Sequence, residues 1–538
     1  MKRILVVLLL IVAAPLAFAS TIEAGPRKDG KPYGGGLSYG EYGRPATLDP
    51  ITSNEMISLR LTELIFNGLV GINEKQEIVP ELAERWERSP DGRVYTFHLR
   101  KAVTWHPREG EEPKPFTADD VIFTYKIMTH PKTITPLKVR YEFIDTVEKL
   151  DDSSIKFTLK RPILNALAKF SFKIIPKHGP ANPNYLTRDD PFVQNPIGTG
   201  PYLLKNVTAE REIVLAANEN YFKGRPHIDK FTAKPFADQN IMTQALMFNA
   251  IDMIVLVNPR DIPEIQGDKR FNLQPYNALS YSFFGYNARN PLLADKRVRT
   301  AFTHAVNRQE MLDSFFNGQG TIISGPFAPG SWAYNLDVQP LAFDPEKAKA
   351  LLREAGFTPG ADGIMQKDGK KLALSLKVPI EKESEAVKRV VLAFKNYLKN
   401  IGADIRVEFK EWQAWKEDVF FEHDFDIIFA SWVFDDSADI SSLFHSGEIG
   451  PWKNNFGGYS NTEVDGLINE SKLTLDHEKR RTINRKLHAI LADENPYTFL
   501  WTLTNYAGYH KKVRRVAIHP YKFFSYADDW FMEEKDQK

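Results

Sequence analysis

The chain has 538 residues, of which 43% are hydrophobic and 12% aromatic, so it can form packed cores and more than one domain. Its 70 Lys and Arg residues nearly balance 69 Asp and Glu residues, which argues against nucleic acid or an anionic membrane as a partner. The absence of cysteine excludes disulfides, thiolate metal ligands, a cysteine nucleophile and the lipid-bearing cysteine of a lipoprotein.

The first residues have the pattern of an export signal. A basic start is followed by an apolar run over residues 4–16, which is too short to span a bilayer comfortably. Ala17-Phe18-Ala19 then provides the small-x-small pattern that a signal peptidase cuts after. We predict an exported protein cleaved after Ala19, with a flexible leader over residues 20–36. A retained anchor is the alternative, but no stop-transfer segment or basic flank follows.

Helices and strands then alternate irregularly. Residues 117–128 predict a helix with Thr117 as N-cap and acidic residues in its first turn. Residues 95–99 and 155–159 alternate between apolar and polar side chains, which predicts two half-buried strands beside that helix. We expect a small α+β unit inserted early in the chain.

The second half has the pattern of a parallel sheet. Asp295 and Asp344-Pro345 are helix starts, and Gly356 ends the second of these helices. A strand over 372–378, a helix over 384–400 and a strand from Ile405 then form a βαβ unit. The near-continuous apolar run 425–432 predicts a strand buried on both faces, followed by helices over 463–474 and 476–493 and a final strand over 497–502.

One string fits a serine hydrolase. Gly36-Leu37-Ser38-Tyr39-Gly40 matches G-x-S-x-G, but a Gly-rich leader precedes it and a proline-containing segment follows, where the nucleophile elbow needs a strand and then a helix. We therefore predict no catalytic residue and no enzyme activity.

Metal and cofactor motifs are missing from the sequence. There is no H-E-x-x-H, no Walker loop and no EF-hand string. His423-Asp424 and His445 are isolated, so we interpret them as structural or surface residues. We predict no metal site and no cofactor.

Ser431-Trp432-Val433-Phe434-Asp435-Asp436 stands where the buried strand ends. Ligands of open α/β sheets bind beyond the carboxyl ends of strands, and an ammonium group would find a carboxylate and an aromatic surface here. The alternative is a solvated acidic turn, and the residues alone leave both interpretations open.

Further motifs carry a family resemblance over nearly the whole mature chain. They follow one another in this order: Leu48-Asp49-Pro50, Leu82-Ala83-Glu84-Arg85-Trp86, Phe116-Thr117-Ala118-Asp119-Asp120-Val121, Asn195-Pro196-Ile197-Gly198-Thr199-Gly200-Pro201-Tyr202, Asn220-Tyr221-Phe222-Lys223-Gly224 and Val298-Arg299-Thr300-Ala301-Phe302. The set resembles the family 5 extracellular solute-binding proteins, the dipeptide and oligopeptide binders of ABC importers.

The resemblance implies an α/β, bilobal periplasmic-binding-protein fold of type II, with an extra inserted α+β domain and a hinge between the lobes. The expected limits are a signal peptide at 1–19, a leader at 20–36, the first lobe at 37–60 and 191–283, the inserted domain at 61–190, the second lobe at 284–502, and a first-lobe return with the C-terminal tail at 503–538.

The resemblance also implies site residues. Asp435 would hold the amino terminus of a peptide, Trp432 and Phe434 would line the cleft, and the backbone of Ser431 to Phe434, with Val433, would pair with the ligand like an added strand. Gly40, Glu41 and Tyr42 match the opposite wall, and Lys382 is the nearest match to a residue that holds the peptide carboxylate. The sequence departs from the family in Asp436-Ser437-Ala438-Asp439, which lacks the usual proline and puts the ligand in doubt.

The implied function is that of a periplasmic, monomeric binding protein that captures di- or oligopeptides by hinge closure and delivers them to ABC importer permease subunits with cytoplasmic ATPases. An oligosaccharide, nickel complex, haem or another amino-acid derivative is the alternative ligand within the family. Other classes are an exported hydrolase, and a periplasmic chaperone or signalling subunit with the same fold.

Overall fold

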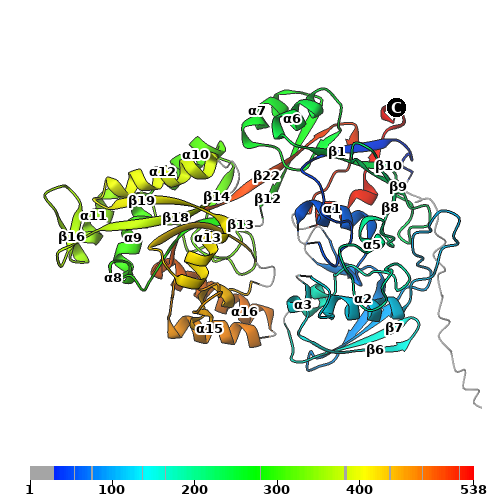
Figure 1. Ribbon diagram of the computed structural model, residues 1–538, viewed down its shortest axis with the longest axis horizontal. Helices are drawn as coiled ribbons and strands as arrows, with labels where there is room; N and C mark the ends of the chain where they lie inside the picture. The colour runs from blue at the N-terminus through cyan, green and yellow to red at the C-terminus, as the bar shows by residue number, and fades with distance from the viewer. Residues whose placement is uncertain are drawn as a thin grey trace, which may run out of the picture.

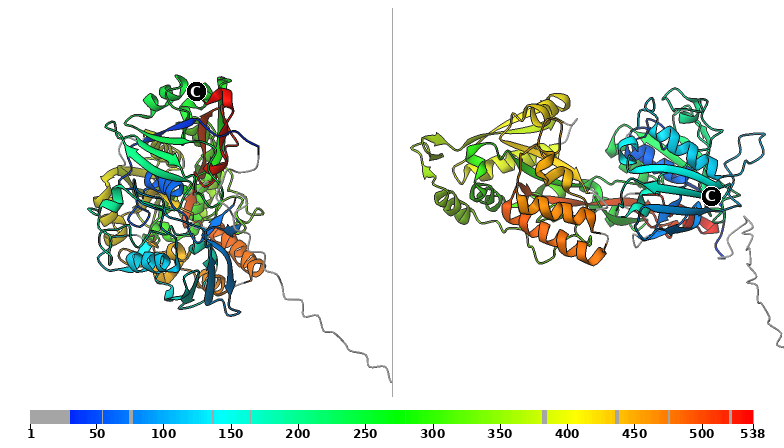
Figure 2. Two further views of the ribbon diagram at one scale, coloured as in Figure 1. Left: turned by 90° about the vertical axis from the view of Figure 1, so that its right-hand side faces the viewer. Right: turned by 90° about the horizontal axis from the view of Figure 1, so that it is seen from below.

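The computed structural model describes residues 30–537 except 54, 74–76, 136, 164, 279, 381–384, 435–437, 475 and 520–521. The predicted signal peptide and most of the predicted leader lie outside these residues. The chain forms two lobes joined by a few strands (Figure 1), and the view from below shows a narrow waist between them (Figure 2). Among the described residues, no helix is long and apolar enough to cross a membrane.

The first lobe is built on an eight-stranded mixed sheet. Its strands are, in order, β12 (Phe271–Asn277), β22 (Trp501–His510), β11 (Met253–Ile254), β1 (Gly36–Tyr42), β10 (Lys230–Phe236), β9 (Ile213–Ala217) and β8 (Tyr202–Val207), with β14 (Gly320–Ile322) added to β22. The helices of this lobe are α1 (Met56–Ile65), α5 (Pro191–Gln194), α6 (Gln239–Met247) and α7 (Ile262–Gly267). Leu61, Leu64 and Ile65 of α1 pack into its core.

A separate four-stranded sheet forms the predicted insertion. It contains β4 (Ala83–Arg88), β5 (Val94–Leu99), β7 (Ser154–Leu159) and β6 (Ile144–Asp151), with α2 (Ala118–Thr129) packed beside it and a hairpin of β2 (Val70–Ile72) and β3 (Ile78–Pro80) nearby. The backbone N–H of Thr117 donates to the Asp120 carboxylate at 2.9 Å, so α2 starts where the sequence predicts.

The second lobe contains a five-stranded sheet with the order β19 (Asp404–Glu411), β18 (Ala373–Ile380), β20 (Ile427–Val433), β13 (Ser280–Tyr286) and β21 (Tyr497–Phe499). Strands β18 and β19 are parallel and are connected by α12 (Glu385–Lys399), which confirms the predicted βαβ unit. The longer helices of this lobe are α9 (Lys296–Ala305), α10 (Arg308–Phe316), α11 (Pro345–Glu354), α15 (Thr462–Leu473) and α16 (His477–Glu494).

Shorter elements complete the described chain. They are α3 (Leu137–Arg140), α4 (Ala166–Lys169), α8 (Pro291–Ala294), β15 (Thr358–Pro359), β16 (Met365–Lys367), β17 (Lys370–Lys371), α13 (Trp412–Lys416), a π-helix (Glu417–Glu422), α14 (Ser441–Phe444), β23 (Val513–Arg514) and β24 (Phe531–Met532), with 3-10 turns at Pro259–Asp261, Ser446–Glu448, Ala527–Asp529 and Glu534–Asp536.

Two neighbouring connections join the lobes. The chain passes from β12 to β13 between Asn277 and Ser280, and it returns from β21 through β22. The two connections lie side by side, since Asn277 is paired with Thr504 and the Ala278 N–H donates to the Leu503 carbonyl at 3.0 Å. These adjacent strands are the physical connection about which the lobes can rotate.

Four predicted domain limits fall inside elements of the structure, and the limit 36/37 cuts β1 after its first residue. The limit 60/61 cuts α1, whose apolar face belongs to the first lobe, and 283/284 cuts β13, which pairs throughout with second-lobe strands. The limit 502/503 cuts β22, which starts against β14 and continues against β12 to His510. The hydrophobic pattern of a strand indicates which of its faces are buried. It does not indicate which sheet the strand joins, so it cannot fix a domain limit.

Candidate functional site

A gap opens in the second-lobe sheet between β18 and β20. The two strands are paired through only two positions, Leu376 with Ile427 and Lys377 with Ile428. Strand β20 continues to Val433, and over 429–433 its described pairing is with β13 alone. Residues 429–433 therefore present one strand edge whose N–H and C=O groups no described strand occupies, at the carboxyl ends of parallel strands.

A cavity of about 450 Å³ lies at this gap. This volume falls within the range of roughly 300–1,000 Å³ that is usual for small-molecule sites. The described residues that line it are Pro379, Val387, Lys388, Phe409, Trp412, Trp415, Phe420, Phe429, Ala430, Ser431, Trp432 and Phe456. Most of them are apolar or aromatic, and Lys388 is the one charged residue among them.

The aromatic side of the cavity is a continuous chain of rings. Trp412 stacks on Trp415, with ring centroids 5.4 Å apart and an angle of 12° between the planes, and Trp415 meets Phe420 edge to face at 5.9 Å. Phe420 contacts both Phe456 at 5.5 Å and Trp432 at 6.4 Å, and those two rings stack at 5.9 Å. The rings hold one another in place, so the wall is formed before any ligand arrives.

A buried lysine holds the segments that carry this wall against the sheet. The Lys377 ammonium of β18 lies 2.8 Å from the Asp418 carboxylate and 2.7 Å from that of Asp424, and the Trp415 indole N–H donates to the Lys377 carbonyl at 3.3 Å. Burial alone would lower the pKa of Lys377, but its hydrogen bonds to the two aspartates raise it. The lysine therefore stays charged and attaches the π-helix and α13 to the sheet.

The cavity lies close to the connection between the lobes. Val433 at the end of β20 is paired with Ser280 at the start of β13, and Asn277 already belongs to the first-lobe sheet. In Figure 1 this end of β13 is the one nearest the first lobe. Rotation about the connecting strands would carry the first lobe toward the free edge of β20.

The four predicted residues at the end of β20 have different environments. Trp432 is half-buried and Ser431 is exposed, and both line the cavity, while Val433 is 68% exposed and is not part of the lining. Phe434 is only 5% exposed, and its ring packs on Tyr281 at 5.0 Å. Phe434 therefore anchors the strand end in the core, and its ring is not free to line a cleft as the resemblance implied.

The two predicted charge anchors are Asp435 and Lys382. Asp435 and Lys382 lie outside the described residues, as does Asp436. Their roles stay predictions. In the chain Asp435 follows Phe434 directly, and Lys382 follows the end of β18 by two residues.

The predicted first-lobe wall consists of one exposed residue and two supporting ones. Tyr42 is 53% exposed, whereas Gly40 is buried and paired with both Lys234 and Ile254. A Cβ atom on Gly40 would lie 2.7 Å from the Met242 side chain, so the glycine allows α6 to approach the sheet. Of the three, Tyr42 is the residue whose side chain reaches solvent.

Glu41 is buried and bound to a partner. Its carboxylate accepts two hydrogen bonds from the Arg60 guanidinium, at 2.6 and 2.7 Å. Burial raises the pKa of Glu41, and the bonds to Arg60 oppose that rise. Burial would lower the pKa of Arg60, but the Glu41 carboxylate outweighs it and raises the pKa. The pair fixes β1 to α1 beside the sheet.

The residues of the rejected motifs have structural roles. Ser38 lies in the middle of β1, and its hydroxyl donates to Asp252 at 2.9 Å, so no nucleophile elbow is present there. His423 ends the π-helix with a left-handed backbone, and Nδ1 of His445 accepts from the Gly447 N–H at 2.9 Å. The part of the chain that the structure describes contains no cluster of three or more His, Asp or Glu side chains suited to a metal ion.

Sequence reasoning missed most of the aromatic wall. Trp412, Trp415 and Phe420 lie within ten residues of one another, and this density of rings was the available signal. Phe456 comes from a distant segment, and nothing in the sequence alone connects it with β20.

Known proteins match this chain over most of its length. The model of bacterial extracellular solute-binding proteins, family 5, matches residues 77–451. The oligopeptide-binding protein AppA of Bacillus subtilis is 29% identical over 541 residues, covering 99% of this chain and 98% of that protein. The dipeptide-binding protein of Escherichia coli is 28% identical over 462 residues, covering 82% of this chain and 84% of that protein.

Solved structures agree. The Bacillus subtilis AppA complex with a nonapeptide superimposes with a TM-score of 0.74 at 29% identity, covering 94% of this chain and 100% of that chain. HbpA2 from Haemophilus parasuis has a TM-score of 0.82 at 23% identity, covering 92% of this chain and 99% of that one, which supports the fold alone. These matches confirm the predicted bilobal fold. Because the family model matches most of the chain, the protein belongs to the family 5 bacterial extracellular solute-binding proteins.

Proposed function

We propose that this protein captures di- and oligopeptides between its lobes and delivers them to the permease of an ABC importer. The observation that carries the proposal is the free edge of β20 over 429–433, which opens into a cavity beside the connection between the lobes. The relatives named as oligopeptide- and dipeptide-binding proteins, and the nonapeptide complex of one of them, support it.

An extended peptide has the backbone geometry that a strand edge requires. Residues 429–433 can exchange main-chain hydrogen bonds with it, and such bonds do not depend on the ligand's side chains. We propose that Asp435 binds the ligand ammonium and Lys382 its carboxylate, as the resemblance implies. Trp432 forms the wall beside this edge, and Tyr42 is the first-lobe residue that would meet the ligand on closure.

Closure uses the two connecting strands. The ligand favours the closed state only to the extent that it binds that state more tightly, so contacts to the second lobe have to be completed by contacts to the first. The importer would then recognise the closed protein. Export with cleavage after Ala19, a periplasmic location and a monomeric state form part of the same proposal, and cleavage can be checked by N-terminal sequencing of the secreted protein.

A thermal-shift screen tests the proposal. The mature protein is heated with di-, tri- and longer peptides, with N-acetylated versions of the same peptides, with cello- and xylo-oligosaccharides and with nickel. We expect peptides to raise the Tm, and acetylation or Asp435→Asn to remove that rise, because a buried ammonium without its carboxylate is costly. Asp436→Asn is the matched control, since it makes the same charge change one residue away.

Stabilisation by sugars or nickel alone would retain the family role but overturn the assignment of peptides. Peptide-induced shifts that survive both acetylation and Asp435→Asn would overturn the proposed anchor and leave peptide binding in place.

A further inference from the structure

We infer that the cavity is a pocket for an aromatic side chain, so that one position of the captured peptide has to be Phe, Tyr or Trp for tight binding. The inference rests on the proposed peptide-binding function and names the class of peptide within it. Main-chain pairing alone would accept a peptide of any sequence. The lining of this cavity instead favours particular side chains.

The geometry of an added strand decides which ligand side chains enter. Successive side chains of an extended segment point to opposite faces of a sheet. On β20, Phe429 belongs to the core on the α12 face, while Ala430 and Trp432 pack with the core on the other face. A peptide beside this edge therefore directs alternate side chains toward α12 and toward the aromatic rings.

The ring face suits a large planar group. Trp412, Trp415, Phe420, Trp432 and Phe456 line one side of a 450 Å³ space, with neighbouring centroids 5.4 to 6.4 Å apart. Those separations match the distances at which aromatic rings interact, so a further ring can stack on or meet the edge of those present. A methyl side chain would leave most of this space unfilled.

Acidic side chains would find no partner among the rings. Lys388 is the one charged residue of the described lining, it belongs to α12, and its ammonium is 2.8 Å from the Glu385 carboxylate. The ring face itself is formed by Trp and Phe. A Glu side chain directed there would lose its hydration without an ion pair from the rings.

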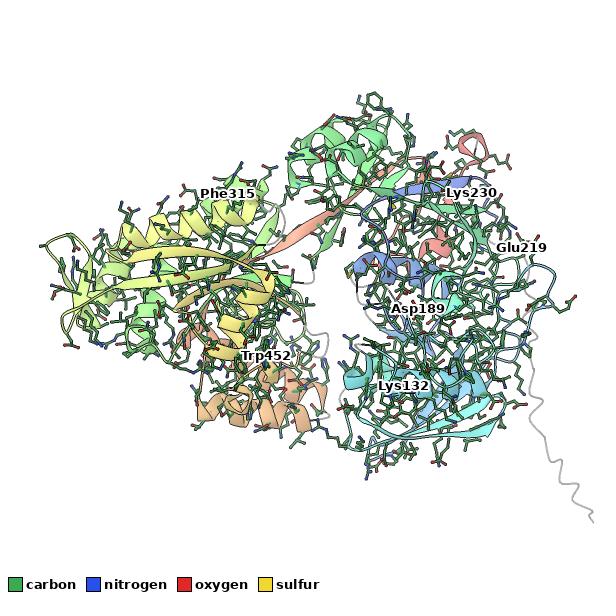
Figure 3. All side chains as sticks on the ribbon, viewed as in Figure 1. Lys132, Asp189, Glu219, Lys230, Phe315 and Trp452 are labelled. Atoms are coloured by element: carbon green, nitrogen blue, oxygen red, sulfur yellow. The ribbon has the colours of Figure 1, made fainter. Side chains whose placement is uncertain are left out.

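Trp412 allows the pocket to be tested without disturbing the core. It is 46% exposed and stacks on Trp415 at the rim of the cavity. Trp452 is a matched control, because it is 52% exposed, lies in the same lobe and is not part of the lining (Figure 3). Trp452 contacts Phe421 at 5.7 Å, so both variants remove one ring-to-ring contact.

The experiment is calorimetric titration of the mature protein with trialanine and with three tripeptides in which Phe replaces one alanine in turn. We expect one Phe position to bind roughly 10- to 100-fold more tightly than trialanine, the gain typical of burying an aromatic side chain. Glu at the same position should lose that gain. Trp412→Ala should weaken the favoured Phe peptide by about fivefold or more beyond its effect on trialanine, and Trp452→Ala should change neither.

The outcomes distinguish the aromatic pocket from the proposed peptide-binding function. If all Phe peptides bind within about twofold of trialanine, or if Trp412→Ala weakens both ligands equally, the aromatic pocket is wrong and peptide binding stands. If no peptide binds while a sugar or nickel does, the proposed function fails and the pocket inference fails with it.

Discussion

Ser280, the first residue of β13, is paired with Val433, the last residue of β20. Three residues before Ser280, Asn277 is paired with Thr504 in the first-lobe sheet. The free edge of β20 and the strands that join the lobes are therefore adjacent parts of one structure. A ligand that binds this edge therefore lies beside the strands that connect the lobes.

Ligand binding should make the protein more compact. The peptide that gives the largest thermal shift should lower the radius of gyration measured by small-angle X-ray scattering, because the ligand favours the state in which both lobes contact it. The N-acetylated form of the same peptide is the control. An unchanged radius at saturating peptide would contradict hinge closure.

Removing Arg60 should destabilise the first lobe strongly. Arg60→Ala leaves the buried Glu41 carboxylate without its partner, and we expect the free energy of unfolding to fall by about 3–5 kcal/mol. The double variant Glu41→Gln with Arg60→Met should recover much of this loss, since no unpaired charge is then buried. Urea denaturation of the three proteins measures both effects. Equal stability of the single and double variants would show that the charge is not the cause.

Gly198 should tolerate no side chain. A Cβ atom there would lie 1.8 Å from the Ile65 carbonyl oxygen, so the backbone has to move, and we expect Gly198→Ala to cost about 3 kcal/mol or more. At Gly267, the end of α7, an alanine methyl group would have no atom within 4 Å apart from its chain neighbours and the backbone of its own helix, so Gly267→Ala should change stability by about 1 kcal/mol at most. Thermal unfolding of both variants compares them, and equal Tm values would contradict this steric explanation.

Acid should weaken the fold through two buried histidines. Burial lowers the pKa of His106 and of His488 from 6.5 to about 4. The unfolded chain therefore binds these protons first, and stability that is complete above pH 6.5 is lost as the pH falls toward 4, by about 1.4 kcal/mol per pH unit for each ring.

A pH series of urea unfolding curves measures this loss. His488→Gln should make stability less dependent on pH over that window, whereas His477→Gln, in which an exposed ring is replaced, should leave the dependence unchanged. Parallel curves for the wild type and His488→Gln would contradict the assignment.

The sequence predicted helices and strands well where the apolar residues repeat with a single spacing. Thr117, Asp295 and Asp344 cap helices as expected, and the βαβ unit from Ala373 to Glu411 is present with parallel strands. These features depend on neighbours within a few residues, which a sequence displays directly. The lobe assignments of β13 and β22 depend on which distant strands they pair with, and no local pattern encodes that.

The candidate site was predictable only in part. Trp432 follows from its place at the end of a buried strand. The burial of Phe434 against Tyr281 and of Glu41 against Arg60 depends on contacts with segments elsewhere in the chain. The cavity itself arises because β18 and β20 separate after two paired positions, and such a separation leaves no mark in the hydrophobic pattern of either strand.

The most direct test of peptide capture by β20 is calorimetric titration with one peptide in its unmodified form and in a series of forms, each methylated at a different backbone nitrogen. Methylation removes an N–H donor and keeps every side chain and both charged ends, so main-chain pairing predicts that at least one methylated form binds about tenfold or more weakly than the unmodified peptide. Equal affinity for all forms would contradict strand addition at residues 429–433.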